Sequence, residues 1–328
     1  MKISDPRRVR YLSLCRQFGK HVQNLTLDLS VSSQGPREQP PAGDLIFSGV
    51  LGYCLNLRKL AIEYKDSDIT LHHLLAVALS GLTRLETLHI LGSKDFAYED
   101  FYHHYSPIVH HNLLSTALDH YSSYLRSLSL RSLIPLHPLT FRRVRDTVTR
   151  LREIDFTRCI GVELRSALAE PQRWACADHL QHIRLVRCQG VHAAIFANQL
   201  AAGIFGHPRT VRLAICGDFA DLENLPFAPK WSIPRLELLE LDHFASWEMK
   251  YLGQIHAEIV RMDRTWQSGY EPLVEALKNA AMFPGVQALE VGDSWEEEQF
   301  DGLKEACLSR GIKAVELVRF DRTDLDWV

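Results

Sequence analysis

One strand-like pattern occurs twice near the middle of the chain. Residues 151–159 (LREIDFTRC) and 180–188 (LQHIRLVRC) both read apolar-x-x-apolar-x-apolar-x-x-Cys, and their starts are 29 residues apart. Alternate side chains of a strand point to opposite faces, so Ile154 and Phe156 share one face while Asp155 lies on the other. One such strand cannot bury its apolar side alone, whereas stacked copies can. The pattern therefore predicts a stack of repeated strands.

The same template recurs along the whole chain. It occurs ten times, and six of the nine intervals between first positions are 26 to 29 residues long. The fourth- and sixth-position anchors are Leu25/Leu27, Leu60/Ile62, Leu88/Ile90, Leu128/Leu130, Ile154/Phe156, Ile183/Leu185, Val211/Leu213, Leu239/Leu241, Leu289/Val291 and Val315/Leu317. Consensus and spacing resemble those of leucine-rich repeats. We expect an α/β fold, a right-handed solenoid of about ten repeats, with a parallel sheet on the concave side of an arc and helices on the convex side.

Composition narrows the class of protein. The chain is 46% hydrophobic and 23% charged, as in folded globular proteins, and its net charge of −3 gives no basic field for nucleic acid. No apolar run approaches the roughly 18 residues of a membrane span. Cys159, Cys188 and Cys216 share one repeat position, which indicates a ladder of small buried thiols, with a metal site or disulfides as the alternative. Reduced thiols favour a cytoplasmic or nuclear location.

The intervals also predict where the chain departs from the repeat. Residues 9–14 carry a shortened strand template close before the first full copy, so residues 1–21 are expected to form an N-terminal cap or junction, followed by the solenoid over 22–328. Three loop insertions are expected, each after a strand and before the next helix, so that all project from one rim. They cover residues 32–44, 93–106 and 245–271.

Helices are expected between the strands. Apolar spacing predicts them near residues 45–53, 71–82, 106–121, 141–148 and 191–205. A last helix is predicted to begin with a capping box of Ser294 and Glu297 and to end at Gly311.

Polar side chains between the anchors would line the sheet on its open face. The fifth-position row is expected to have a basic middle followed by an acidic C-terminal third. Such a surface selects a protein partner by charge complementarity, although any solvated strand face also carries charges. The concave-face candidates for partner binding are Arg131, Asp155, Arg158, Arg184, Arg187, Arg212, Glu240, Asp242, Glu290 and Asp293.

Two of the expected insertions are rich in aromatic residues, which commonly anchor interfaces. The rim-loop candidates for partner binding are Phe96, Tyr98, Phe101, Tyr102, Tyr105, Trp247, Tyr251, Trp266 and Tyr270. The alternative is that these rings pin the loops onto the solenoid.

The sequence contains none of the common catalytic, metal-binding or phosphate-binding motifs. There is no H-E-x-x-H, C-x-x-C, G-x-S-x-G or phosphate-binding glycine loop, so no catalytic, cofactor or metal residues are assigned. Histidines crowd one region, and a histidine-dependent hydrolase built on the inserted loops is the minor alternative. These histidines are His103, His104, His110, His111 and His120.

A family resemblance adds a more specific expectation. The segments 159–162 (CIGV), 188–191 (CQGV) and 8–14 (RVRYLSL) resemble the repeat region of F-box/leucine-rich-repeat proteins of fungal type. The resemblance implies a non-catalytic module whose repeats bind the substrate of a ubiquitin ligase. The sequence has no F-box-like Leu-Pro-x-Glu segment, so a ligase adaptor is expected as a partner only with an F-box upstream. A repeat-only scaffold or enzyme inhibitor remains the alternative; neither nucleic acid nor membrane is an expected partner.

Overall fold

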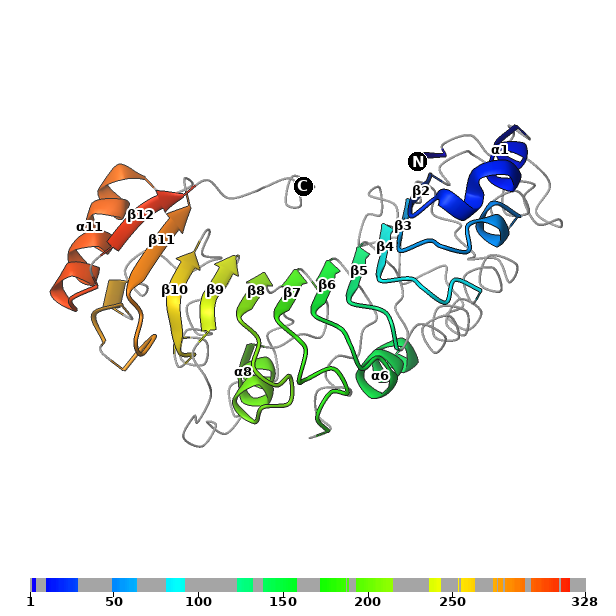
Figure 1. Cartoon of the computed structure of the whole chain (residues 1–328). Coiled ribbons are helices and arrows are strands. Elements are labelled where there is room, and N and C mark those ends of the chain that lie inside the picture. Colours follow the sequence, from blue (N-terminus) through cyan, green and yellow to red (C-terminus); the bar gives the residue numbers. More distant parts are fainter. Residues whose placement is uncertain are drawn as a thin grey trace, which may run out of the picture. The chain divides into compact units, whose positions relative to one another are not determined.

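A computed structural model of the chain divides into two compact units, Met1–Val162 and Glu163–Val328. Each unit has an α/β architecture with a parallel sheet (Figure 1). The structure describes residues 2–3, 10–28, 49–63, 81–91, 123–131, 138–157, 172–186, 188, 193–214, 236–242, 253, 255–262, 274–275, 277–279, 281–292, 296–312 and 314–318.

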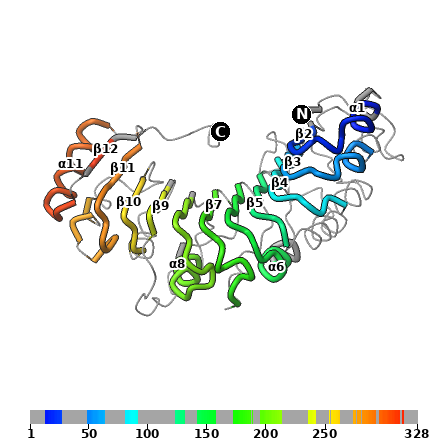
Figure 2. The backbone as a smooth tube through the Cα atoms, viewed as in Figure 1, coloured from blue at the N-terminus to red at the C-terminus, as the bar shows by residue number. Residues whose placement is uncertain are grey.

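The strands of unit 1 lie side by side in chain order (Figures 1 and 2). They are β1 (Lys2–Ile3), β2 (Asn24–Asp28), β3 (Lys59–Glu63), β4 (Thr87–Leu91), β5 (Ser127–Arg131) and β6 (Glu153–Thr157), and every neighbouring pair is parallel. The helices described in this unit are α1 (Arg10–Phe18), the short 3₁₀ helix η1 (Gly19–His21), a turn of helix over 49–53, and α6 (Pro138–Thr147).

Unit 2 repeats this arrangement. Its strands are β7 (His182–Val186), β8 (Thr210–Ala214), β9 (Leu236–Asp242), β10 (Ala257–Met262), β11 (Ala288–Gly292) and β12 (Ala314–Val318), again parallel and in chain order. The helices α8 (Ala193–Ala201) and α11 (Glu297–Ser309) lie in the connections.

The predicted anchors form the core of both units. All ten anchor pairs lie in strands, and nine of the ten pairs are buried, each side chain being at most 4% exposed. Val315 of the tenth pair is half-buried. Equivalent anchors are Cα partners on neighbouring strands, as Leu25 is with Leu60 and Leu60 with Leu88. The sequence template is thus confirmed as the pattern that fills the core.

The turn that enters each strand also repeats. The N–H groups of Arg58 and Lys59 donate to the Gln23 carbonyl at 2.8 and 2.9 Å, and those of Glu86 and Thr87 donate in the same way to Arg58 at 2.8 and 2.9 Å. The turn before β8 uses the same bonds, from residues 209 and 210 to the carbonyl of residue 181. Each repeat therefore supplies the acceptor for the next, which satisfies backbone groups that the strands leave unpaired.

The N-terminal segment differs from its prediction. Residues 9–14 were expected to form a shortened strand, but residues 10–18 are the helix α1. The strand that extends the sheet is β1, whose Lys2 and Ile3 are aligned with Thr26 and Leu27 of β2. A short apolar stretch fits both helical and strand spacing, and here packing favours the helix, which buries Cys15.

The third expected insertion is also different. Residues 245–271 were predicted to be a loop, but they contain strand β10, which pairs with β9 on one side and β11 on the other. Ala257, Val260 and Met262 of β10 are buried at the positions of the template. The 50-residue interval between the eighth and ninth copies of the template therefore contains an additional repeat strand. Its first template position is the small residue Ala257, and its second anchor is Met262.

The helices agree with their predictions in part. The helices expected near 141–148 and 191–205 are α6 and α8; those expected near 71–82 and 106–121 lie outside the described residues. Helix α11 ends at Ser309, and Gly311, the residue predicted to suit its C-terminal cap, follows two residues later with φ +80°. Its capping box is formed by Glu296 and Gln299, with the Glu296 N–H donating to Gln299 Oε1 at 3.2 Å, and not by Ser294 and Glu297.

Candidate functional site: the polar strips on the strands

One row of side chains on each unit forms the candidate site. It is the fifth position of the template, which lies between the two buried anchors and therefore on the opposite face of the sheet. In unit 1 this row, the unit 1 strip, consists of Thr26, Ala61, His89, Ser129 and Asp155, which are Cα partners in that order. In unit 2 the row, the unit 2 strip, consists of Arg184, Arg212, Glu240, Arg261, Glu290 and Glu316.

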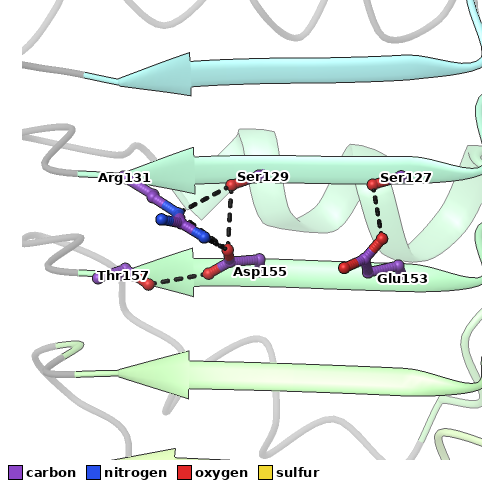
Figure 3. Close-up of polar contacts among 6 residues, drawn as sticks. All are labelled: Ser127, Ser129, Arg131, Glu153, Asp155 and Thr157. Carbon is purple, nitrogen blue, oxygen red and sulfur yellow. Dashed lines mark hydrogen bonds and ion pairs between the residues drawn. The ribbon is translucent and has the colours of Figure 1, made fainter. Parts of the chain in front are cut away.

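Asp155 is the centre of a polar cluster on β5 and β6 (Figure 3). Arg131 donates to its Oδ2 from Nη2 at 2.6 Å and from Nε at 2.9 Å, and the Ser129 hydroxyl donates to the same oxygen at 3.1 Å. Thr157 Oγ1 donates to Oδ1 at 2.8 Å. The Asp155 residue is only 4% exposed, so these four donors replace its water shell.

The cluster holds the Arg131 guanidinium in one orientation. Its Nε lies 3.2 Å from Ser129 Oγ as well as 2.9 Å from Asp155, and the side chain stays 31% exposed. A guanidinium is planar and rigid, so contact with a buried acid fixes its orientation while part of it stays at the solvent edge. Arg131 therefore presents a pre-oriented cation on the open face of the sheet.

The same two strands carry a more exposed contact one position earlier. Ser127 Oγ donates to Glu153 Oε2 at 2.9 Å, and Glu153 is exposed (Figure 3). Surface contacts of this kind contribute little to stability. Buried and exposed polar pairs thus lie side by side on β5 and β6.

Charges alternate in a ladder along the middle of the unit 2 strip, from Arg212 to Glu290, while Arg184 lies beside Arg212 and Glu316 beside Glu290. Glu240 Oε1 lies 2.6 Å from Arg212 Nε, and its Oε2 lies 3.4 Å from Arg261 Nη1. Arg261 in turn donates to Glu290 Oε2 from Nε at 2.5 Å. The Glu240 side chain is 10% exposed and that of Arg261 is 32% exposed. Acids are therefore covered while Arg261 keeps an accessible edge.

This ladder changes the predicted charge distribution. The sequence reading placed an acidic C-terminal third on the row, but β10 inserts Arg261 between Glu240 and Glu290. The prediction of an unbroken acidic third is wrong at β10, because the strand that carries the cation was predicted to be a loop. Glu290 and Glu316 remain neighbouring acids on β11 and β12. Opposite charges on neighbouring strands stabilise the sheet, whereas a run of carboxylates would repel.

His89 is an exposed member of the unit 1 strip, next to Ala61 and Ser129. The surrounding strands remove part of the water around its ring, and this desolvation, followed by the charge of Arg131, lowers the pKa of His89 below its ordinary value. Glu153 and Asp155 act in the opposite direction and do not reverse the shift. The ring is therefore neutral near pH 7 and presents an uncharged donor and acceptor.

The predicted partner-binding residues are located only in part. Arg131, Asp155, Arg184, Arg212, Glu240 and Glu290 all lie on the strands as expected. Asp242 ends β9, while Arg158, Arg187 and Asp293 lie outside the described residues. Asp155 and Glu240 are buried, so their role is to hold the neighbouring arginines. Arg261 was not among the predicted residues, because its strand β10 lies in a segment predicted to be a loop.

The rim-loop candidates cannot be placed on the structure. All nine aromatic residues predicted there, and the histidines of the minor hydrolase alternative, lie outside the described residues. The rim hypothesis therefore stays a prediction.

The cysteines that the structure describes are reduced and buried. They are Cys15, Cys54, Cys176, Cys188 and Cys307. Burial raises the pKa of Cys54 and of Cys176 to about 12, and that of Cys307 to about 11. Of the predicted cysteine ladder, Cys188 is a buried thiol that contacts the Val186 carbonyl at 3.6 Å, and Cys159 and Cys216 lie outside the described residues. Within the described ranges, no three His, Cys, Asp or Glu side chains are grouped to hold a metal ion.

None of the helices described here is both long and apolar enough to cross a membrane.

Comparison with known proteins identifies no family for this chain. No protein-family model matches the sequence, and no curated protein matches it significantly.

Proposed function

We propose that this chain is a right-handed solenoid of the leucine-rich-repeat type and that it acts as a non-catalytic protein-recognition module. The observation that supports the proposal best is the pair of polar strips, which lie in strand register with the buried anchors on the opposite face. Each repeat then contributes one recognition position to a surface that is continuous within each unit. Stacked repeats use extended surfaces of this kind to bind other macromolecules.

The chemistry of the strips favours a folded protein as the partner. Arg131, which follows the unit 1 strip position Ser129 by two residues, and Arg261 of the unit 2 strip are held by buried or nearly buried acids and remain about one-third exposed. Side chains that are ordered before binding lose less conformational entropy in a complex, and arginine is enriched in protein interfaces. Because acids and bases alternate from Arg212 to Glu290, the unit 2 strip would discriminate partners by the positions of their charges and not by net charge.

Two versions of this function remain within the proposal. In the first, the resemblance to F-box/leucine-rich-repeat proteins applies, and the partner is a substrate presented to a ubiquitin ligase in the cytoplasm or nucleus. In the second, the repeats clamp one enzyme or scaffold partner without ubiquitination. Both versions place the partner on the same strips.

Binding to a purified partner tests the proposal. Partners captured from cells with the intact chain are identified and purified, and their affinities are measured by calorimetry. The strip variant combines His89→Ala, in the unit 1 strip, with Lys59→Ala and Glu153→Ala. Lys59 and Glu153 are exposed and lie two residues before the strip positions of β3 and β6, so they share its face of the sheet. We expect it to bind at least about tenfold more weakly, because interface energy is concentrated in few residues.

A matched variant controls for general effects of surface mutation. Arg142→Ala and Arg150→Ala change exposed residues in α6 and in the turn that follows it. We expect this control to bind like the unaltered chain. Equal affinity of strip variant and control would remove the unit 1 strip as the recognition surface. Ubiquitination of the partner in reconstituted reactions separates the first version from the second.

A further inference from the structure

A second surface, at the N-terminal end of unit 1, exposes large apolar side chains. Leu14 and Phe18 of α1 are 46% and 50% exposed, and Tyr53 and Leu55 are 42% and 60% exposed. We call these four residues the N-terminal patch. Single exposed apolar residues are common on protein surfaces, but several that lie close together mark an interaction site.

The two segments that carry the patch are packed together. The thiols of Cys15 and Cys54 are hydrogen-bonded, and Asn56 Nδ2 donates to the Lys20 carbonyl at 2.8 Å. Gly19 approaches Tyr53 so closely that an added Cβ would lie 2.6 Å from the Tyr53 carbonyl oxygen. The segments around α1 and around residue 54 therefore form one surface.

The patch residues lie beside these contacts. Leu14 and Phe18 are one helical turn apart and so share a face of α1, next to the buried Cys15. Tyr53 and Leu55 are the immediate neighbours of Cys54 in the chain. The buried thiol contact is thus flanked by exposed apolar side chains from both segments.

The two segments that carry the patch contain basic residues and no acidic ones. Residues 10–27 and 49–59 contain no aspartate or glutamate, although the whole chain has a net charge of −3. Their basic residues are Arg10, Arg16, Lys20, Arg58 and Lys59. Arg16 and Lys20 are exposed and lie on α1 and η1, the segment that also carries Leu14 and Phe18. Arg58 is paired with Glu86 at 3.5 Å, so Arg16 and Lys20 are the cations considered for a ligand. An apolar patch with exposed cations on the same segment is complementary to an acidic, amphipathic ligand.

We propose that the N-terminal patch is a docking site for an acidic amphipathic helix of another protein. Apolar residues of that helix, spaced by three and four positions, would cover Leu14, Phe18, Tyr53 and Leu55, and its carboxylates would face Arg16 and Lys20. This is the common mode in which a helix binds an apolar surface through one face. The site uses none of the residues of the two polar strips, so it stands or falls independently of the proposed function.

A designed peptide tests this docking site. The probe is a dye-labelled helical peptide with leucine and phenylalanine along one face and glutamate on the others, and its binding to the full chain is measured by fluorescence anisotropy. The same peptide with lysine in place of glutamate is the charge control. We expect the glutamate peptide to bind, the lysine peptide to bind at least about tenfold more weakly, and the affinity to fall with added salt.

Two variants of the chain remove the two halves of the site. Leu14→Ser with Phe18→Ser removes apolar contact, and Arg16→Glu with Lys20→Glu reverses the charge without touching the core. Each is expected to weaken peptide binding at least about tenfold, as for central interface residues. Leu308→Ser is the matched control, because Leu308 is 57% exposed on α11 of the other unit. Circular dichroism confirms that each variant is folded.

Several results would overturn the proposal. One is a glutamate peptide that binds both variants as well as the unaltered chain, and another is equal binding of the lysine peptide. A third is binding to vesicles with phosphatidylserine, lost in both variants, with no binding of either peptide, which would make the patch a membrane contact. A fourth is a dimer of the chain that Leu14→Ser with Phe18→Ser dissociates while the peptide does not bind.

Discussion

At the scale of single residues, the burial of a charged side chain determines whether it holds a neighbouring residue in place or faces solvent. Asp155 and Asp146 are both aspartates with an arginine neighbour, but Asp155 is almost wholly buried and Asp146 is exposed. A buried carboxylate must be matched by donors, and Asp155 has four of them from three side chains. Its role is to hold Arg131, while Arg131 faces solvent.

Replacement of Asp155 by alanine should therefore be costly. Asp155→Ala leaves Arg131, Ser129 and Thr157 without a shared acceptor, and we expect the free energy of unfolding to fall by about 2–3 kcal/mol. Arg131 is partly solvated, which keeps the loss below that of a fully buried pair. Glu153→Ala, on the same strand but exposed, should cost about 0.5 kcal/mol or less. Urea unfolding measures both; equal losses would show that the cluster does not hold the strands.

The His89 ring makes the stability of unit 1 depend on pH. Folding lowers its pKa, so the unfolded chain binds a proton more readily than the folded chain. This contribution is complete above about pH 6.5 and is lost as the pH falls from there through the lowered pKa. When the pH is lowered from 7 to about 5.5, the free energy of unfolding should therefore fall less for the His89→Gln variant than for the unaltered chain. Urea unfolding at both pH values checks this, and an identical pH dependence would contradict it.

The buried thiols should resist modification until the chain opens. Burial raises the pKa of Cys54 and Cys176 to about 12, so almost no thiolate is present at about pH 8. We expect iodoacetamide to label both residues in urea and to leave both unlabelled in the native chain. Peptide mass spectrometry reads the labelling. Rapid native labelling of Cys54 would mean that α1 and the segment around residue 54 separate readily.

At the scale of elements, the alternation of charges across β8 to β11 links four strands. Arg261 of β10 lies between Glu240 of β9 and Glu290 of β11, and it contacts both carboxylates. Without Arg261 the two acids would share one side of the sheet with no cation between them. The strand that the sequence analysis assigned to a loop thus completes the ladder.

Arg261→Met tests this linkage. It retains most of the aliphatic length and removes the charge, and we expect a loss of about 1–2 kcal/mol, since the pair is only partly buried. Adding Glu290→Gln removes the acid that lost its partner, so the double variant should lose at least about 0.5 kcal/mol less than the sum of the single losses. Denaturant titrations of all three variants provide the values. Strict additivity would contradict a direct interaction between the two side chains.

Much of this architecture could be predicted from the repeat spacing, because the alternation of side chains within one strand is enough to determine which residues are buried. β10 was missed since alanine and methionine, in place of leucine, weaken its strand signal. α1 was assigned to a strand because a short apolar segment fits two periods. The burial of Asp155 could not be predicted, because Arg131 and Ser129 come from a neighbouring strand, and sequence spacing does not show which side chains cover one another.

At the scale of the whole molecule, each unit combines one buried apolar face with one open polar face. The anchors in the core stabilise the stack, and the strips display side chains whose positions the stack fixes. In the proposed function, recognition would be distributed over the repeats, and a partner would be selected by the order of charges along a unit. The N-terminal patch adds a surface of different chemistry on unit 1.

Photo-crosslinking in the complex with a purified partner tests recognition by the strips most directly. A photoreactive residue is placed at His89, an exposed position of the unit 1 strip, and in a second protein at Arg150, an exposed position in the turn before β6. We predict that the partner is crosslinked from His89 and not from Arg150. Crosslinking from Arg150 with none from His89 would contradict recognition through the strip.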